Sequence, residues 1–389
     1  GNWYTDPIVA KVRGATRRAD LDQSVDDILR LEKMLTDEGA LVIKYWFHLS
    51  KKGQKARLEK LEKNPKTRWR VTKHDWDLFA QYDKYVKTAG HVLRLTSSGN
   101  APWIVVDGTD EYHRSLTVGR HLLEAVRNRL KQKADKATRV TAAPLTRALD
   151  GRDLINALDL TQKLSKAKYE EQLEKLQGRL NILSRSPKFR ERSVILVFEG
   201  NDAAGKGGTI RRVTSALDAR SYQIVPVAAP TEEERAQPYM WRFWRHVPRK
   251  GRMCIFDRSW YGRVLVERVE GFCKEPDWMR AYAEINDFEH QLARHGAIIL
   301  KFWLAISSEE QFRRFKEREK TRFKRFKITD EDWRNREKWD QYEQAVCDMV
   351  DRTSTGHAPW HLVEANDKNF ARIKVLKALR DRLEAELKG

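Results

Sequence analysis

Long apolar segments and cysteines are both scarce in this sequence of 389 residues. It has no run of eighteen apolar residues, and residues 1–30 lack the basic start, apolar stretch and small-residue cleavage site of a signal peptide. Its three cysteines are too few and too scattered for a disulfide framework or a zinc site. These absences argue against export and membrane insertion, and we expect a cytoplasmic protein.

Acidic side chains are outnumbered by basic ones along the whole chain. The formal net charge is +20; the first 140 residues carry 28 basic and 18 acidic side chains, and the other 249 carry 48 and 38. Because the excess is spread evenly, the whole molecule presents a basic field. Such a field indicates a polyanionic partner, whether nucleic acid, an acidic membrane or a phosphate polymer, and charge alone does not choose among them.

The chain matches itself at a constant offset of 257 residues. Two copies of one fold are therefore expected: a degenerate, truncated copy in residues 1–145 and a catalytic domain in residues 146–389, with a polar linker at 138–153. At this offset the partner of Gly200 falls before Gly1, so the first copy lacks its phosphate-loop half, and we expect a fragment of a longer chain. The matched pairs include Trp3 and Trp260, Tyr4 and Tyr261, Glu32 and Glu289, Lys44 and Lys301, and segments 96–103 and 353–360.

A glycine-rich segment follows the apolar run 194–198 in the second copy. The run is typical of a buried parallel strand, and the segment after it, GNDAAGKGG at 200–208, leads into a helical pattern that extends to about residue 217. Strand, glycines, lysine and helix are the parts of a Walker A phosphate loop, in which backbone N–H groups and Lys206 contact phosphate oxygens. The candidate phosphate-binding residues of this loop are Gly200, Ala203, Gly205, Gly207 and Gly208.

One position departs from the Walker A pattern. The usual Ser or Thr after the lysine, whose hydroxyl holds Mg²⁺, is Gly207 in this chain. Asp202 lies inside the loop, and a hard cation prefers oxygen ligands of this kind, so we expect Asp202 to hold the metal instead. A turn aspartate that caps the following helix is the alternative.

A second motif, GRMCIFDRSWYGR at 251–263, combines a short apolar strand with a terminal aspartate, as in Walker B. Asp257 would bind Mg²⁺ at the carboxyl end of the strand, where open α/β sheets collect their ligands. Arg258 and Arg263 follow at once, and their guanidinium groups could hold several phosphate oxygens in a bidentate manner. The alternative is that both are ordinary surface arginines.

A basic segment at 307–329 is the third element. Arg314, Arg318 and Arg322 are four residues apart, which predicts one face of a helix. In a phosphate-loop kinase a pair of basic helices at this place would close as a lid over the phosphates. A solvated helix with Glu–Arg pairs is the alternative.

Together, the loop at 200–208, the segment 230–272 (PTEEERAQPYMWRFWRHVPRKGRMCIFDRSWYGRVLVERVEGF) and the basic lid resemble the family-2 polyphosphate kinases over about residues 158–387. The resemblance implies reversible, Mg²⁺-dependent transfer between inorganic polyphosphate and nucleotides. It also implies a thymidylate-kinase-like, three-layer α/β/α P-loop fold with a parallel sheet and a helical lid. The roles that it implies are Mg²⁺ binding by Asp202 and Asp257, phosphate contact by Lys206, Arg258 and Arg263, an essential acid at Glu267, and lid contacts by Arg314 and Arg318.

The duplicated layout resembles the two-domain members of that family, which phosphorylate AMP to ADP. The first copy departs from the catalytic motif, since Asp6 and Ala10 stand where Arg263 and Glu267 are expected, and we expect it to have a structural or oligomer-forming role. A homo-oligomer without a stable nucleic-acid partner is therefore expected. An ATP-dependent nucleotide kinase, a polyphosphate kinase acting on ADP or GDP, and a non-catalytic binder of nucleic acid or another polyanion are the alternatives.

Overall fold

A computed structural model describes residues 2–131 and 157–388 of the chain, which separates into two compact units, Gly1–Thr138 (unit 1) and Arg139–Gly389 (unit 2). The expected linker at 138–153 and the expected boundary at residue 145 lie outside the described residues. No helix in the described part of the chain is both long and apolar enough to cross a membrane.

Unit 2 contains a five-stranded, wholly parallel sheet with the strand order β4-β5-β3-β6-β7. The apolar run that predicts a strand at 194–198 forms the centre of β3, which is one or two residues longer at each end. The helix that follows ends at Thr214, earlier than expected. The elements of unit 2 are α7 (Lys166–Ser184), η2 (Lys188–Glu191), β3 (Ser193–Gly200), α8 (Lys206–Thr214), η3 (Ala219–Ser221), β4 (Tyr222–Pro226), α9 (Glu232–Arg235), α10 (Trp241–Trp244), β5 (Met253–Asp257), η4 (Trp260–Arg263), α11 (Val266–Val269), α12 (Glu275–Arg294), β6 (Ala297–Ala305), α13 (Ser308–Lys320), η5 (Arg322–Lys327), α14 (Asp330–Glu337), α15 (Trp339–Thr353), β7 (Trp360–Glu364) and α16 (Lys368–Lys388).

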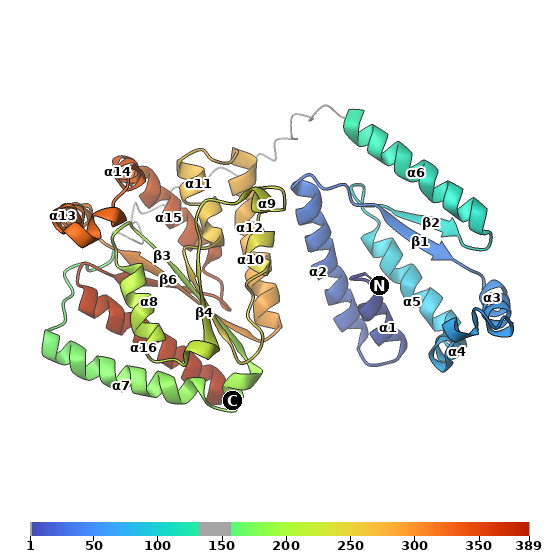
Figure 1. Ribbon diagram of the computed structural model, residues 1–389, viewed down its shortest axis with the longest axis horizontal. Coiled ribbons are helices and arrows are strands. Elements are labelled where there is room, and N and C mark those ends of the chain that lie inside the picture. The colour runs from blue at the N-terminus through green and yellow to red at the C-terminus, as the bar shows by residue number, and fades with distance from the viewer. Residues whose placement is uncertain (1, 132–156, 389) are drawn as a thin grey trace. The chain divides into compact units, whose positions relative to one another are not determined.

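Helices cover both faces of this sheet: α7, α8 and α16 pack on one face, and α10, α12 and α15 on the other (Figure 1). Every residue of β3 from Ser193 to Glu199 is buried, which is why the central strand is a continuous apolar run instead of an alternating one. The α/β class expected from the sequence is therefore confirmed, with a parallel sheet between two helical layers.

Unit 1 contains a two-stranded parallel sheet, in which Lys44 of β1 pairs with Trp103 of β2. Both strands are five residues long. The elements of unit 1 are α1 (Thr5–Val12), α2 (Arg18–Asp37), β1 (Lys44–His48), α3 (Lys51–Lys63), η1 (Arg68–Arg70), α4 (Lys73–Ala80), α5 (Tyr82–Thr96), β2 (Trp103–Asp107) and α6 (Glu111–Lys131).

A buried lysine–glutamate pair lies in the core of unit 2. Lys301 Nζ is 2.7 Å from Glu289 Oε2 and also donates to Thr353 O at 2.7 Å, and both charged side chains are fully buried. Glu289 Oε1 accepts from Trp260 Nε1 at 3.0 Å and from Tyr261 OH at 2.7 Å. The network therefore joins α12, β6, the end of α15 and the turn after β5.

The same network recurs in unit 1 at the offset of 257 residues. Lys44 Nζ is 2.7 Å from Glu32 Oε2 and donates to Thr96 O at 2.6 Å. Glu32 Oε1 accepts from Trp3 Nε1 at 3.3 Å and from Tyr4 OH at 2.6 Å. The matched positions thus share hydrogen-bond partners as well as residue types.

We expect Lys301→Met to destabilise unit 2 by about 3–5 kcal/mol, because Glu289 would remain as a buried charge without its partner. Lys44→Met should cost unit 1 a similar amount. Denaturant unfolding measures both effects, with Lys377→Met as the exposed control, for which a change within about 0.5 kcal/mol is expected. A Lys301→Met protein as stable as the Lys377→Met control would contradict this account.

Candidate functional site

The loop after β3 turns directly into α8 at the carboxyl edge of the sheet. Gly200 has a φ of +149°, and a Cβ there would lie 2.4 Å from Leu304 O, so only glycine fits. Gly205 has a φ of +108° and forms the N-cap of α8, whose first residue is Lys206. The backbone N–H groups at this helix start are therefore directed at the carboxyl edge, as in loops that bind phosphate.

Lys206 and Asp202 both lie on this loop. Lys206 Nζ donates to Gly200 O at 2.7 Å, so the lysine side chain folds back along the loop. The Asp202 carboxylate accepts from Arg258 Nη2 at 3.2 Å and from Asn335 Nδ2 at 2.9 Å. Asp202 therefore connects the loop to the residues that follow β5 and to α14.

Asp257 and Arg258 follow the neighbouring strand. The register pairs Phe198 of β3 with Asp257 of β5, which brings the strand-end aspartate to the same edge as the loop. Arg258 has a φ of +64°, a conformation that is strained for a residue with a side chain, and its N–H donates to Phe198 O at 3.0 Å. Burial lowers the pKa of Arg258. The surrounding carboxylates have the larger, opposite effect, so the pKa lies above its ordinary value. These carboxylates belong to Asp202, Glu199, Glu331 and Asp257.

Glu199 was missed by the sequence analysis, although it directly precedes Gly200. It is 5% exposed and accepts a hydrogen bond from Ser259 Oγ at 2.8 Å, which links the end of β3 to the turn after Arg258. Burial raises its pKa, and the charges of Lys206 and Arg258 only partly oppose this. An acidic residue directly after the apolar run 194–198 is the signal that could have identified it.

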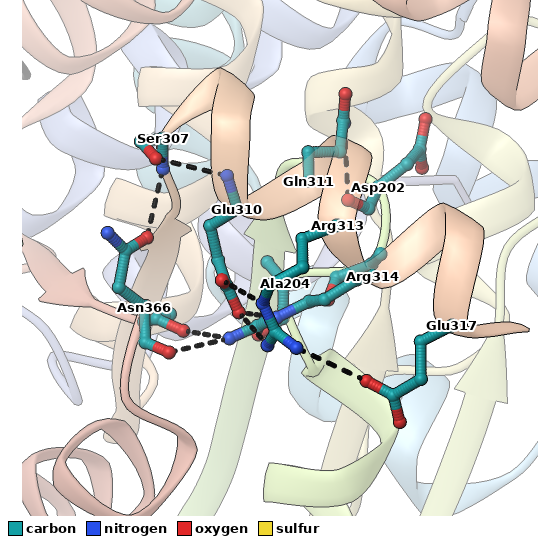
Figure 2. A network of polar contacts seen from close by, with 11 residues as sticks. Asp202, Ala204, Ser307, Glu310, Gln311, Arg313, Arg314, Glu317 and Asn366 are labelled. Carbon is teal, nitrogen blue, oxygen red and sulfur yellow. Dashed lines mark hydrogen bonds and ion pairs between the residues drawn. The ribbon is translucent and has the colours of Figure 1, made fainter.

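Arg314 supports the loop through hydrogen bonds to its backbone carbonyl groups and is not placed to bind a phosphate (Figure 2). It is 3% exposed, and protein atoms accept all of its five N–H groups. These acceptors are Ala203 O at 2.9 Å, Ala204 O at 3.1 Å, Ala365 O at 2.7 Å, Asn366 O at 2.8 Å and Glu310 Oε1 at 2.6 Å. The expected lid contact of Arg314 is therefore wrong, since an arginine has no further donor to offer.

The helix face expected to hold Arg314, Arg318 and Arg322 is wrong at its third residue. Helix α13 ends at Lys320, and Arg322 begins the separate 3₁₀ turn η5, so Arg322 does not share a helix face with Arg314. Arg318 lies one helical turn beyond Arg314 on α13 and is half-buried. Gln311, on the same helix, donates to Asp202 O at 3.2 Å, which fixes α13 on the loop.

Arg263 and Glu267 form an ion pair, with Arg263 Nε 3.2 Å from Glu267 Oε2. The Arg263 guanidinium lies 4.0 Å from the ring centroid of Tyr239, whose hydroxyl accepts from Arg263 N and donates to Trp260 O. The structure therefore places Glu267 beside Arg263 and holds both against the turn after β5.

A pocket of about 80 Å³ opens beside the loop. Leu265, Val266, Trp339 and Tyr342 supply much of its apolar wall, and Asp202 lies on its polar side. Gly200 and Arg258 also line it, whereas Lys206, Asp257, Arg263 and Glu267 do not. The α14 and α15 residues of this wall lie beyond the expected lid segment and were not identified from the sequence.

Unit 2 thus has a parallel sheet with a glycine loop at its carboxyl edge, the arrangement with which many α/β proteins bind phosphate groups. The family model of polyphosphate kinase 2 (PPK2) matches residues 1–134 and 163–389. The chain therefore belongs to the polyphosphate kinase 2 family and is a phosphotransferase.

Three known proteins illustrate the similarity. A polyphosphate:AMP phosphotransferase of Pseudomonas aeruginosa is 59% identical over 388 residues, which span 100% of this chain and 78% of that relative. An ADP-polyphosphate phosphotransferase of the same organism is 38% identical over 221 residues, 57% of this chain and 73% of that relative. The crystal structure of a polyphosphate kinase 2 from Pseudomonas aeruginosa PA01 has a TM-score of 0.87 at 56% identity and covers 100% of this chain and 76% of that one.

We expect Glu199→Gln to stabilise the protein relative to wild type as the pH rises. Below the ordinary glutamate pKa the carboxyl is protonated whether the chain is folded or unfolded, so burial carries no charge penalty there. Because burial raises the pKa of Glu199, the unfolded chain releases this proton first, and wild-type stability is lost as the pH rises through the folded pKa. The glutamine can still accept from Ser259 and does not titrate.

The measurement is the difference in Tm between the two proteins at pH 5 and at pH 8. A small difference at pH 5 that grows in favour of the variant at pH 8 is the expected result. A difference that does not change with pH would show that Glu199 does not titrate in this window.

Proposed function

We propose that this enzyme transfers a phosphoryl group from inorganic polyphosphate to a nucleoside monophosphate, converting AMP to ADP in a reversible reaction. The observation that carries the proposal is the meeting of the glycine loop, Asp202, Asp257 and Arg258 at one carboxyl edge in a chain of the polyphosphate kinase 2 family. Phosphoanhydride is exchanged for phosphoanhydride, which is why the reaction is reversible.

AMP is the favoured acceptor because of how the relatives match. The relative that matches 100% of this chain is a polyphosphate:AMP phosphotransferase, whereas the relative named for ADP matches 57% of it. An enzyme acting on ADP or GDP is the second candidate, and it rests on that shorter match.

Unit 2 supplies the phosphate-binding groups of a P-loop kinase in this proposal. Backbone N–H groups of Gly205, Gly207 and Gly208 at the start of α8 cradle phosphate oxygens, and Lys206 exchanges its bond to Gly200 O for one of them. Arg258 stabilises the charge that develops during transfer. Arg263, held by Glu267 and Tyr239, and Arg318 on α13 contact the outer phosphates.

The residues present fit a Mg²⁺ ion. Asp202 and Asp257 offer hard oxygen donors, and in the described part of the chain no side chain or N–H group donates to the Asp257 carboxylate. No cluster of three or more metal-ligating His, Cys, Asp or Glu side chains occurs among the described residues, so water and phosphate oxygens would complete the coordination. When bound, Mg²⁺ would neutralise charge on the phosphate oxygens.

The pocket beside the loop suits the nucleoside. Its aromatic wall, which includes Trp339 and Tyr342, can pack against a base, and Arg258 on its rim can reach the acceptor phosphate. Closure of α13 and α14 over this region would exclude water, and these helices already contact the loop through Gln311 and Asn335.

Unit 1 is, in this proposal, a degenerate partial copy without catalysis. It keeps the buried network of Lys44 and Glu32, which supports a fold, while Asp6 and Ala10 replace the arginine and the acid of the catalytic turn. A role in structure or oligomer formation follows.

The decisive test is to offer AMP, ADP, GMP and GDP separately with polyphosphate and Mg²⁺, without ATP. We expect ADP from AMP at the highest kcat/KM, measured by chromatography of the nucleotides. ADP that forms only when ATP is added would support an ordinary nucleotide kinase instead.

Asp257→Asn should reduce kcat by about 10²–10³-fold while leaving Tm near that of wild type, since it removes charge at the proposed metal site without changing the size of the side chain. Asp107→Asn, which alters a strand-end aspartate of unit 1, is the matched control and should keep wild-type activity. An Asp257→Asn enzyme with a near-normal kcat would show that the metal is held elsewhere.

A further inference from the structure

Six arginines gather at the amino edge of the unit 2 sheet, opposite the catalytic edge. Met253 of β5 pairs with Val194 of β3 and Tyr222 of β4, so the residues just before these strands lie side by side. Two shallow hollows occur there, and Arg252 lines both. We define the arginine patch by the arginines that line these hollows: Arg185, Arg190, Arg220, Arg245, Arg249 and Arg252.

Backbone contacts hold the patch together. Gly251 N donates to Arg192 O at 2.7 Å, and Val194 N donates to Arg252 O at 3.0 Å, which fixes the turn before β5 against the segment before β3. Gly251 has a φ of +76°, a backbone conformation that is strained for a residue with a side chain, so this turn favours glycine. Segments about sixty residues apart in the sequence are thereby brought into one surface.

Most of the positive charge in the patch is not neutralised. Arg220 pairs with Asp218 at 2.8 Å, and Arg245 lies 3.4 Å from Glu233. In the parts of the chain that the structure describes, the guanidiniums of Arg185, Arg190, Arg249 and Arg252 have no hydrogen bond or ion pair with protein atoms. Like charges so close together repel unless an anion binds between them, and guanidinium forks bind phosphate oxygens well.

We propose that the arginine patch is a second polyphosphate-binding surface, which holds the body of a long chain while its end reacts at the carboxyl edge. This inference rests on the proposed function. A strand rises about 3.3 Å per residue, so the five residues of β5 separate the patch from Asp257 by roughly 15 Å, a span that only a long chain could bridge. Tethering the chain would raise the local concentration of its reactive end.

A phosphate polymer fits the patch better than a single-stranded nucleic acid does. Proteins that bind single strands combine basic grooves with exposed aromatic rings on which bases stack. Of the aromatic residues that line the two hollows, Phe189 is 2% exposed and Tyr222 and His246 are half-buried. The patch therefore offers charge without a stacking platform.

The test uses the full chain with Arg185→Gln, Arg190→Gln and Arg249→Gln combined, since all three side chains are exposed. For long-chain polyphosphate, KM should rise about tenfold. The slope of log KM against log salt concentration should decrease by about two, because three phosphate contacts are lost. With tripolyphosphate, which is too short to span both edges, KM and kcat should match wild type. The charge-matched control is Lys60→Gln, Lys63→Gln and Lys66→Gln on the exposed surface of unit 1, which should leave both substrates unaffected.

Three outcomes would overturn the proposal: an unchanged KM for the long chain, an equal loss with both chain lengths, or weakened binding of single-stranded DNA with polyphosphate kinetics intact. The last would identify a nucleic-acid surface. If wild type makes no ADP from any polyphosphate, the proposed function has failed. The patch is then judged by direct equilibrium binding of long-chain polyphosphate, which the variant must bind more weakly than wild type if the inference holds.

Discussion

The buried pair of Lys301 and Glu289 is the interaction on which both the fold and the site of unit 2 depend. Glu289 accepts from Trp260 and Tyr261, which follow Asp257 and Arg258 by a few residues, so the pair anchors the turn that carries the strand-end aspartate. Two charged side chains are stable in a core without water only when all of their hydrogen-bonding groups have partners. This requirement fixes the positions of α12, β6 and α15 relative to one another. The same requirement explains why the network recurs in unit 1, although Asp6 and Ala10 stand there at the positions of Arg263 and Glu267.

Arginines have three different roles in unit 2, and burial distinguishes them. Arg314 is buried and gives all its donors to carbonyl groups and Glu310, so that it shapes the loop without facing a ligand. Arg258 is half-buried among carboxylates and is held in a strained conformation beside the loop. The arginines of the patch are largely free of acidic partners and lie at the far edge of the sheet. The excess of positive charge in the composition is thus divided between a buried support, the residues beside the loop and an exposed surface.

Sequence reasoning identified the residues that sit on a short local motif. The apolar run before Gly200, the glycine spacing and the strand that ends at Asp257 predicted β3, the loop and β5 because each depends on neighbours in the chain. Sequence reasoning failed where the role of a residue depends on partners that are distant in the sequence. Arg314 was assigned to a lid because its spacing fits a helix face, and spacing does not reveal that four carbonyl groups lie beneath that face. Asn335 and Tyr342 line the pocket without any motif. Glu199 directly follows the apolar run, but only the structure shows that its carboxylate is buried.

The sequence by itself determined the class of fold, the repeat at 257 residues and the position of the glycine loop, since apolar periodicity, glycine spacing and self-similarity are properties of the chain. Only the tertiary structure decided which charged side chains lie at the candidate site or the surface and which are paired inside the protein. Burial and hydrogen-bond partners arise from residues that are far apart in the sequence, and these control whether an arginine supports the loop, joins the site or remains available at the surface.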